Sequence, residues 1–209
     1  MQVSVLSPSI RPDGLKYNQE CLQRQTFQDF EWLVEIGLRT KHDLNAAYNR
    51  MLRRAKGELI VSYQDFIKIE KDGLQKFWDA YQQDPYTFFT APVGQTLDWT
   101  NIEWDWRNHP EAQMTWQSWE IDWGAAPLEC LKKIGGFDEQ MDGYWAGDNV
   151  NVALRAHMMN YNFKLLRDNK AIAFSHNTRI KHPFNHTFNP AKMNERYDAI
   201  RRGEEINYL

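Results

Sequence analysis

Asp65 has a residue type and a position that suit metal chemistry. It ends a predicted strand, with Gln64 before it and Phe66 after it. A carboxylate at such a place can hold Mg²⁺ or Mn²⁺ against a diphosphate, because hard cations prefer oxygen ligands and phosphate oxygens complete the coordination shell. The alternative is an aspartate that caps a turn, and the spacing alone leaves both interpretations open.

Two further residues could act with it. Asp148 follows a glycine- and aromatic-rich stretch and begins a predicted helix, where its carboxylate could take a proton from a substrate hydroxyl. It could equally cap that helix by accepting from free backbone N–H groups. His176 directly follows a predicted strand and could be a metal ligand or a structural histidine. The spacing of His176, His182 and His186 does not indicate a zinc site. These residues alone do not name a reaction.

Alternating strands and helices must position these side chains. Short connections between them predict an α/β fold with a largely parallel sheet. Ligands of such sheets bind beyond the carboxyl ends of the strands, so we expect residues 8–13, 35–40 and 64–67 to border the site. The predicted strands are 2–7, ended by Pro8, 31–36, 58–63, 86–91 and one near 171–175, and the predicted helices are 13–24, 43–55, 72–83 and 149–159.

The composition is that of an ordinary enzyme domain. With 209 residues, 42% of them hydrophobic, the chain can form one domain with its own core. The net charge of −3 does not call for a nucleic-acid partner. No apolar run is long enough for an integral membrane segment, and the N-terminus lacks the pattern of a signal peptide, so we expect a cytoplasmic protein. Cys21 and Cys130 are predicted to be buried free thiols.

Tryptophan is unusually frequent. The chain has nine, five of them between Trp99 and Trp119. So dense a group in a polar stretch suggests a binding wall, since aromatic faces stack on sugar rings and on bases. The alternative, left open by the sequence, is that these rings are mostly core.

Several segments together resemble the family 2 glycosyltransferases of the GT-A fold, in the family's order and over most of the chain. They are VSVLSP at 3–8, QTFQDFEWLV at 25–34, NAAYNR at 45–50, AKGELIV at 55–61, GGFDE at 135–139 and GDN at 147–149. The resemblance implies a single GT-A-type domain over residues 1–209, with a mostly parallel twisted sheet flanked by helices. Residues up to about 95 would form a shortened nucleotide-sugar half, and about 96–209 the acceptor half and C-terminal tail.

The resemblance also implies the reaction and the residues that perform it. The reaction would transfer a sugar from a nucleotide-diphosphate sugar, by default a UDP-sugar, to a hydroxyl of a saccharide acceptor, with inversion and with Mn²⁺ or Mg²⁺. Asp148 would be the general base, and Asp65 and His176 the metal ligands. The nucleotide-sugar contacts would be Pro8, Ser9, Ile10, Glu35, Arg50, Gln64 and Asp65, and the acceptor contacts Trp116, Trp119, Trp123, Trp145 and Asn149.

Four departures from the family pattern keep other functions open. The metal motif retains one acid, the second strand ends in Glu35 rather than in paired aspartates, and the helix and strand that usually follow are nearly absent. The family's Glu-Asp pair is here Asp148-Asn149, so the base is missing if its position corresponds to Asn149. A non-catalytic sugar- or nucleotide-binding protein of the same fold is therefore one alternative.

A transferase that glycosylates a modified base in DNA is another alternative, which the basic cluster of Arg53, Arg54 and Lys56 would serve. A nucleotidyltransferase is less well supported, because residues 9–14 lack its glycine- and lysine-rich loop. The oligomeric state and the role of the C-terminal tail stay open.

Overall fold

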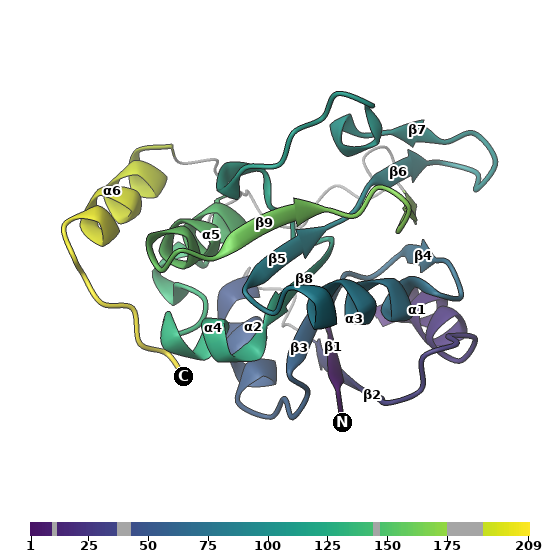
Figure 1. Ribbon diagram of the computed structural model, residues 1–209, viewed down its shortest axis with the longest axis horizontal. Coiled ribbons are helices and arrows are strands. Elements are labelled where there is room, and N and C mark those ends of the chain that lie inside the picture. Colours follow the sequence, from purple (N-terminus) through teal and green to yellow (C-terminus); the bar gives the residue numbers. More distant parts are fainter. Residues whose placement is uncertain (10–11, 37–42, 144–146, 175–189) are drawn as a thin grey trace.

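A six-stranded sheet forms the centre of the computed structural model, which describes residues 1–9, 12–36, 43–143, 147–174 and 190–209 (Figure 1). The strand order is β2-β1-β3-β8-β5-β9, and β8 alone runs antiparallel to its neighbours. The predicted α/β class with a mostly parallel sheet is confirmed. The strands are β1 (Val3–Ser9), β2 (Phe30–Ile36), β3 (Leu59–Tyr63), β5 (Thr87–Thr90), β8 (Trp123–Pro127) and β9 (Asn162–Leu165).

Helices cover both faces of this sheet (Figure 1). Successive strand residues point to opposite faces, so Val5 and Val61 pack under one set of helices while Leu6 and Ile60 pack under the other. Apolar side chains on both faces are typical of parallel strands. One face carries α1 (Leu15–Leu22) and α3 (Gly73–Gln83), and the other carries α2 (Leu44–Leu52), α4 (Leu128–Lys133) and α5 (Asp148–Met158).

A smaller sheet has the order β4-β10-β6-β7. Its strands are β4 (Ile67–Ile69), β6 (Val93–Thr96), β7 (Glu103–Trp104) and β10 (Ala171–Phe174). The last helix is α6 (Pro190–Arg201), and short 3₁₀ turns are η1 (Pro12–Gly14), η2 (Trp106–Asn108), η3 (Trp116–Ser118) and η4 (Glu139–Met141). Among the described helices, none is both long and apolar enough to cross a membrane.

The elements predicted in the first half of the chain are confirmed to within a few residues at their ends, and so are the helix at α5 and the strand at β10. The expectation that Pro8 ends the first strand is wrong, because β1 continues to Ser9 and Pro8 pairs with Glu35 of β2. Pairing of β1 with β3 stops at Leu6, so Pro8 lies where one side of the strand is an edge, and a missing N–H is tolerated there. Cys21 and Cys130 are buried free thiols, as predicted.

A buried polar network fixes α6 against the rest of the fold. Arg196 donates to Asp138 over 2.7 Å, and their side chains are 4% and 0% exposed. Asp138 also accepts from the side-chain amide of Asn151 in α5, and the side-chain oxygen Oδ1 of Asn151 accepts from Arg155. Glu204 provides Arg196 with a second carboxylate at 2.8 Å. A buried charge is costly without a partner, so the Arg196–Asp138 ion pair is needed for α6 to pack with Arg196 buried.

Asp138→Ala should lower the free energy of unfolding by about 3–5 kcal/mol, because it leaves the Arg196 guanidinium buried beside one remaining carboxylate. Urea denaturation followed by circular dichroism measures the change. Asp198→Ala is the matched control in α6, since Asp198 pairs with Arg201 at the surface and its loss should cost no more than about 0.5 kcal/mol. A loss below about 1 kcal/mol for Asp138→Ala would contradict this role.

Candidate functional site

The ends of β1 and β3 bring predicted donor-site residues together. The Ser9 hydroxyl donates to Asp65 Oδ2 over 2.7 Å, and Asp65 is 7% exposed. Asn18 of α1 supports the same corner, because its amide donates to the main-chain oxygen of Gln64 over 2.9 Å. Pro8, Ser9, Gln64 and Asp65 therefore lie at one edge of the sheet, as expected for the carboxyl ends of neighbouring parallel strands.

Glu35 and Arg50 also lie together, but they are paired with each other. Glu35 Oε1 accepts from Arg50 Nε over 2.7 Å, and Glu35 Oε2 accepts from Arg54 over 2.9 Å. Arg50 makes a second contact with Asp43, at 3.1 Å. A nucleotide that contacts either side chain would have to share it with this ion-pair cluster.

Asp148 lies buried in the first turn of α5, 7% exposed, after Gly147 in the left-handed conformation. Asn45 Nδ2 donates to Asp148 Oδ1 over 2.7 Å and to Asp142 Oδ1 over 3.0 Å. The Asp142 carboxylate also accepts from the backbone N–H groups of Asn45 and Ala46, so it caps the start of α2. Burial raises the pKa of Asp148 to about 6; the Asn45 hydrogen bond opposes this rise, and the charge of Asp142 adds to it.

Tyr48 connects this helix junction with the end of β3. Its hydroxyl shares a hydrogen bond with Ser62, three residues before Asp65. Burial raises the pKa of Tyr48, and the negative charges of Asp122 and Asp148 raise it further. The predicted metal ligand Asp65 and the predicted base Asp148 thus approach the same edge of the sheet from different elements.

Asn149 points to a carboxylate that the sequence analysis did not single out. Its amide donates to the main-chain oxygen of Trp119 and to Glu120 Oε2, the latter over 3.1 Å. Burial raises the pKa of Glu120 to about 7, with a further rise from Asp122 that Arg107 partly offsets.

Arg107 does not neutralise Glu120, because two aspartates already share its charge. The buried guanidinium donates to both oxygens of Asp122, over 2.8 and 2.7 Å, and to Asp105 over 2.8 Å. Arg107 and its two aspartates together carry a net negative charge beside Glu120. This charge, with desolvation, favours the protonated form of Glu120 near neutral pH.

The tryptophans predicted to contact an acceptor divide into two kinds. Trp119 and Trp123 are 2% and 0% exposed, and their indole N–H groups donate to the main-chain oxygens of Phe89 and Asn169. These two rings pack in the core, which the sequence left open as the alternative. Trp116 is half-buried and stacks on His157 with 5.8 Å between ring centroids.

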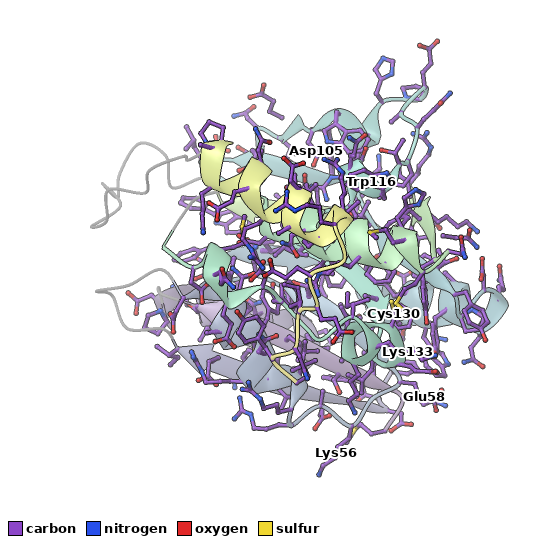
Figure 2. All side chains as sticks on the ribbon, turned by 90° about the vertical axis from the view of Figure 1, so that its left-hand side faces the viewer. Lys56, Glu58, Asp105, Trp116, Cys130 and Lys133 are labelled. Carbon is purple, nitrogen blue, oxygen red and sulfur yellow. The ribbon has the colours of Figure 1, made fainter. Side chains whose placement is uncertain are left out.

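Trp116 lies beside α6. Figure 2 shows it with Asp105 in the upper part of the view, away from Lys56 and Glu58, which precede β3. Of the described tryptophans predicted to contact an acceptor, Trp116 is the one that is not buried in the core.

A second aromatic group adjoins the predicted metal ligand. Phe66 follows Asp65, and its ring lies 5.9 Å from that of Tyr17, which in turn lies 5.1 Å from Trp99. Lys68 Nζ is 3.9 Å from the centroid of the Trp99 ring. Trp99 has a φ of 66°, a conformation that bulky residues rarely adopt and that often marks a functional segment.

Three predicted site residues, Ile10, Trp145 and His176, lie outside the described residues. Within the described ranges, no three His, Cys, Asp or Glu side chains are grouped as a metal site. Asp65 is thus the described member of the predicted metal pair, and its role as a ligand stays a prediction.

Sequence reasoning missed Glu120 and Asp142. The stretch from Trp119 to Trp123 alternates bulky apolar and acidic residues, which is typical of a strand entering the core with its acids on one side. That alternation was the available signal for Glu120. Asp142 gave none, because it caps a helix that begins about a hundred residues earlier in the chain.

Comparison with known proteins identifies the fold. No family model and no curated protein matches the sequence. Among solved structures, S. aureus TarS 1–349 in complex with UDP-GlcNAc matches with a TM-score of 0.69 and 16% identity over 96% of this chain and 65% of that one. S. aureus TarS 1–349 without that ligand matches with a TM-score of 0.64 and 15% identity over 83% of this chain and 60% of that one.

The complex of TarS 1–349 with UDP gives a TM-score of 0.63 at 15% identity, over 84% of this chain and 61% of that one. The chain therefore spans between 60 and 65% of the length of these TarS chains. At this level of identity the likeness establishes a shared fold.

Glu120→Gln should stabilise the protein more at high pH than at low pH. The folded-state pKa of Glu120, about 7, lies above its unfolded value, so the wild type loses stability as the pH rises from about 4.5 through 7, whereas glutamine does not titrate. The free energy of unfolding of the variant relative to the wild type should rise by about 1–3 kcal/mol between pH 4 and pH 8. Urea denaturation across this range measures it, with pH 4 as the internal reference because both side chains are then neutral. A difference that does not change with pH would contradict the described environment of Glu120.

Proposed function

We propose that the chain is a glycosyltransferase of GT-A type that transfers a sugar from a nucleoside-diphosphate sugar to an acceptor hydroxyl with inversion. One observation carries the proposal: two buried acids, Asp65 and Asp148, approach the carboxyl edge of a sheet whose fold is shared with TarS. TarS is a glycosyltransferase and has been solved with UDP and with UDP-GlcNAc, which supports a UDP-sugar as the donor.

The donor is proposed to lie over the ends of β1 and β3. Ser9, Pro8 and Gln64 border this position, and the Glu35–Arg50 pair lies at the end of the neighbouring strand and on α2. Because these groups sit at strand ends, they can contact a ligand without disturbing the sheet. Ile10 is proposed to contribute from beside them.

A divalent cation, Mn²⁺ or Mg²⁺, is proposed at Asp65, with His176 as the second protein ligand. Asp65, the described member of this pair, suits such an ion, because its buried carboxylate offers the hard oxygen ligand that Mn²⁺ and Mg²⁺ prefer. When bound, the ion supplies positive charge to the leaving diphosphate. The Ser9 hydroxyl keeps the Asp65 carboxylate oriented through its 2.7 Å hydrogen bond.

The reaction needs a base for the acceptor hydroxyl. The acceptor oxygen attacks the anomeric carbon, its proton passes to a carboxylate, and the bond to the diphosphate breaks with the electron pair leaving on the nucleotide. In-line attack from the opposite side inverts the anomeric centre. The family resemblance implies Asp148 as the base, and Glu120 is a second carboxylate with a raised pKa.

A saccharide is the proposed acceptor. The half-buried Trp116, next to α5 and α6, can stack on the apolar face of a sugar ring. Asn149 and Glu120 offer hydrogen-bonding groups beside it. The protein is proposed to act in the cytoplasm.

UDP and UDP-GlcNAc should raise the melting temperature of the protein in the presence of Mn²⁺ or Mg²⁺, and EDTA should abolish most of the shift. A ligand at about 100 times its dissociation constant adds about 2.7 kcal/mol of stability, which differential scanning fluorimetry detects readily. Asp65→Ala and the closer analogue Asp65→Asn should both reduce the shift, because they remove the charged oxygen that faces the diphosphate.

The matched control is Asp79→Ala, an exposed aspartate of α3, which should keep the full shift. Circular dichroism confirms that each variant is folded before ligand is added. Absence of a shift with every nucleoside diphosphate tested, with metal present, would refute the donor site.

A further inference from the structure

Glu120 is placed differently from the other acids of the site. It lies in the loop between η3 and β8, directly after the core residue Trp119. Asn149 Nδ2 holds its Oε2 over 3.1 Å. Glu120 is half-buried, and the hydrogen bond from Asn149 is the one that its carboxylate makes among the described residues.

Asp148 is fixed by its surroundings instead. Its Oδ1 accepts from Asn45, whose amide also binds Asp142, and its own backbone N–H faces the carboxylate. These contacts connect the first turn of α5 to the first turn of α2. The geometry is that of a carboxylate that joins two helix starts.

We propose that Glu120, rather than Asp148, accepts the proton of the acceptor hydroxyl, and that Asn149 is the positioning residue that holds the Glu120 carboxylate. The proposal rests on the glycosyltransferase function proposed above and names the base of that reaction. The acceptor O–H bond breaks and its proton moves to Glu120 Oε1. The acceptor oxygen forms the bond to the anomeric carbon, and the nucleoside diphosphate leaves with the electron pair of the broken bond.

The charges around Glu120 suit a base that works near neutral pH. Asp122 and Asp105 face it from one side with Arg107 between them, and Asn149 faces it from α5. Desolvation and the aspartates raise the pKa of Glu120 to about 7, where a carboxylate is a stronger proton acceptor than at its ordinary value.

Glu120 also explains why an amide can stand at position 149. An aspartate there would place two carboxylates at hydrogen-bonding distance, and two such groups do not ionise together at neutral pH. The Asn149 amide donates a hydrogen bond to Glu120 instead. In this proposal, Asn149 replaces the second acid of the family's Glu-Asp pair, and Glu120, from a different segment of the chain, is the base.

The test compares wild type, Glu120→Gln, Asp148→Asn and Asn149→Asp, with Glu111→Gln as a matched control on the same segment. The donor is whichever of UDP-GlcNAc, UDP-glucose and UDP-galactose the wild type turns over fastest, the acceptors are water and glycerol, and UDP release is measured with Mn²⁺. Azide is the second nucleophile, and its glycosyl adduct is detected by mass spectrometry. Azide has no proton to lose and so needs no base.

Glu120→Gln should lower UDP release with hydroxyl acceptors by about 10²–10⁴-fold while keeping azide transfer within a few-fold of the wild type. Asp148→Asn, if folded, should keep hydroxyl transfer within about tenfold, because asparagine can still accept from Asn45. Asn149→Asp should move the acid limb of the pH profile to higher pH, since a like charge raises the pKa of its neighbour. Glu111→Gln should be unchanged.

Hydroxyl transfer by Glu120→Gln within fivefold of the wild type would overturn the proposal, as would an equal loss of azide transfer, which would mark a structural role. Either result, with the UDP-induced thermal shift intact, leaves the glycosyltransferase proposal standing. UDP binding without turnover of any of the three donors would favour a non-catalytic binding protein, and both proposals would fall.

Discussion

Asn45 donates from one amide nitrogen to both Asp142 and Asp148, and this shared contact joins the first turns of α2 and α5. Asp142 in turn accepts from the backbone N–H groups at the start of α2. The loop residue Asp142 and the first turns of α2 and α5 are therefore joined by hydrogen bonds. Tyr48, on α2, then reaches Ser62 of β3. Through these contacts, the start of α5 is held against β3, the strand that Asp65 follows, and Asn149 is held where it meets Glu120.

Desolvation is the main cause of the raised pKa values of Asp148 and Glu120. Asp148 and Glu120 both have raised pKa values because burial disfavours the charged form, and neither forms an ion pair with a cation among the described residues. Arg107, whose charge acts on Glu120, is shared between Asp105 and Asp122. Buried acids with raised pKa values are typical of functional sites, and this is the electrostatic reason to regard this region as a candidate site.

The fold was largely predictable from the sequence, since the alternation of strands and helices up to residue 91 depends on local patterns. Elements after residue 91 were harder to predict. β8 is short and contains Gly124, and β6 and β9 are four-residue strands whose pairing partners lie far away in the chain. Strand pairing of that kind leaves little periodicity in the sequence.

The site was predictable only in part, for a related reason. Ser9, Gln64 and Asp65 were found because strand ends are visible in the sequence, and Asp148 because a helix begins there. Glu120 and Asp142 act through contacts about 30 and 97 residues away in the chain, which no local pattern reveals. Burial of Trp119 and Trp123 likewise depends on which strand they enter, so composition could not separate core from binding wall.

A crystal structure of the protein with UDP-GlcNAc and Mn²⁺ is the most direct test that the edge formed by β1, β3 and α5 is a sugar-transfer site. The expected result is a diphosphate against Asp65 and Ser9, with the anomeric carbon facing the Glu120–Asn149 pair. A nucleotide sugar bound at another surface, or one whose anomeric carbon points away from both Glu120 and Asp148, would contradict a transferase site at this edge.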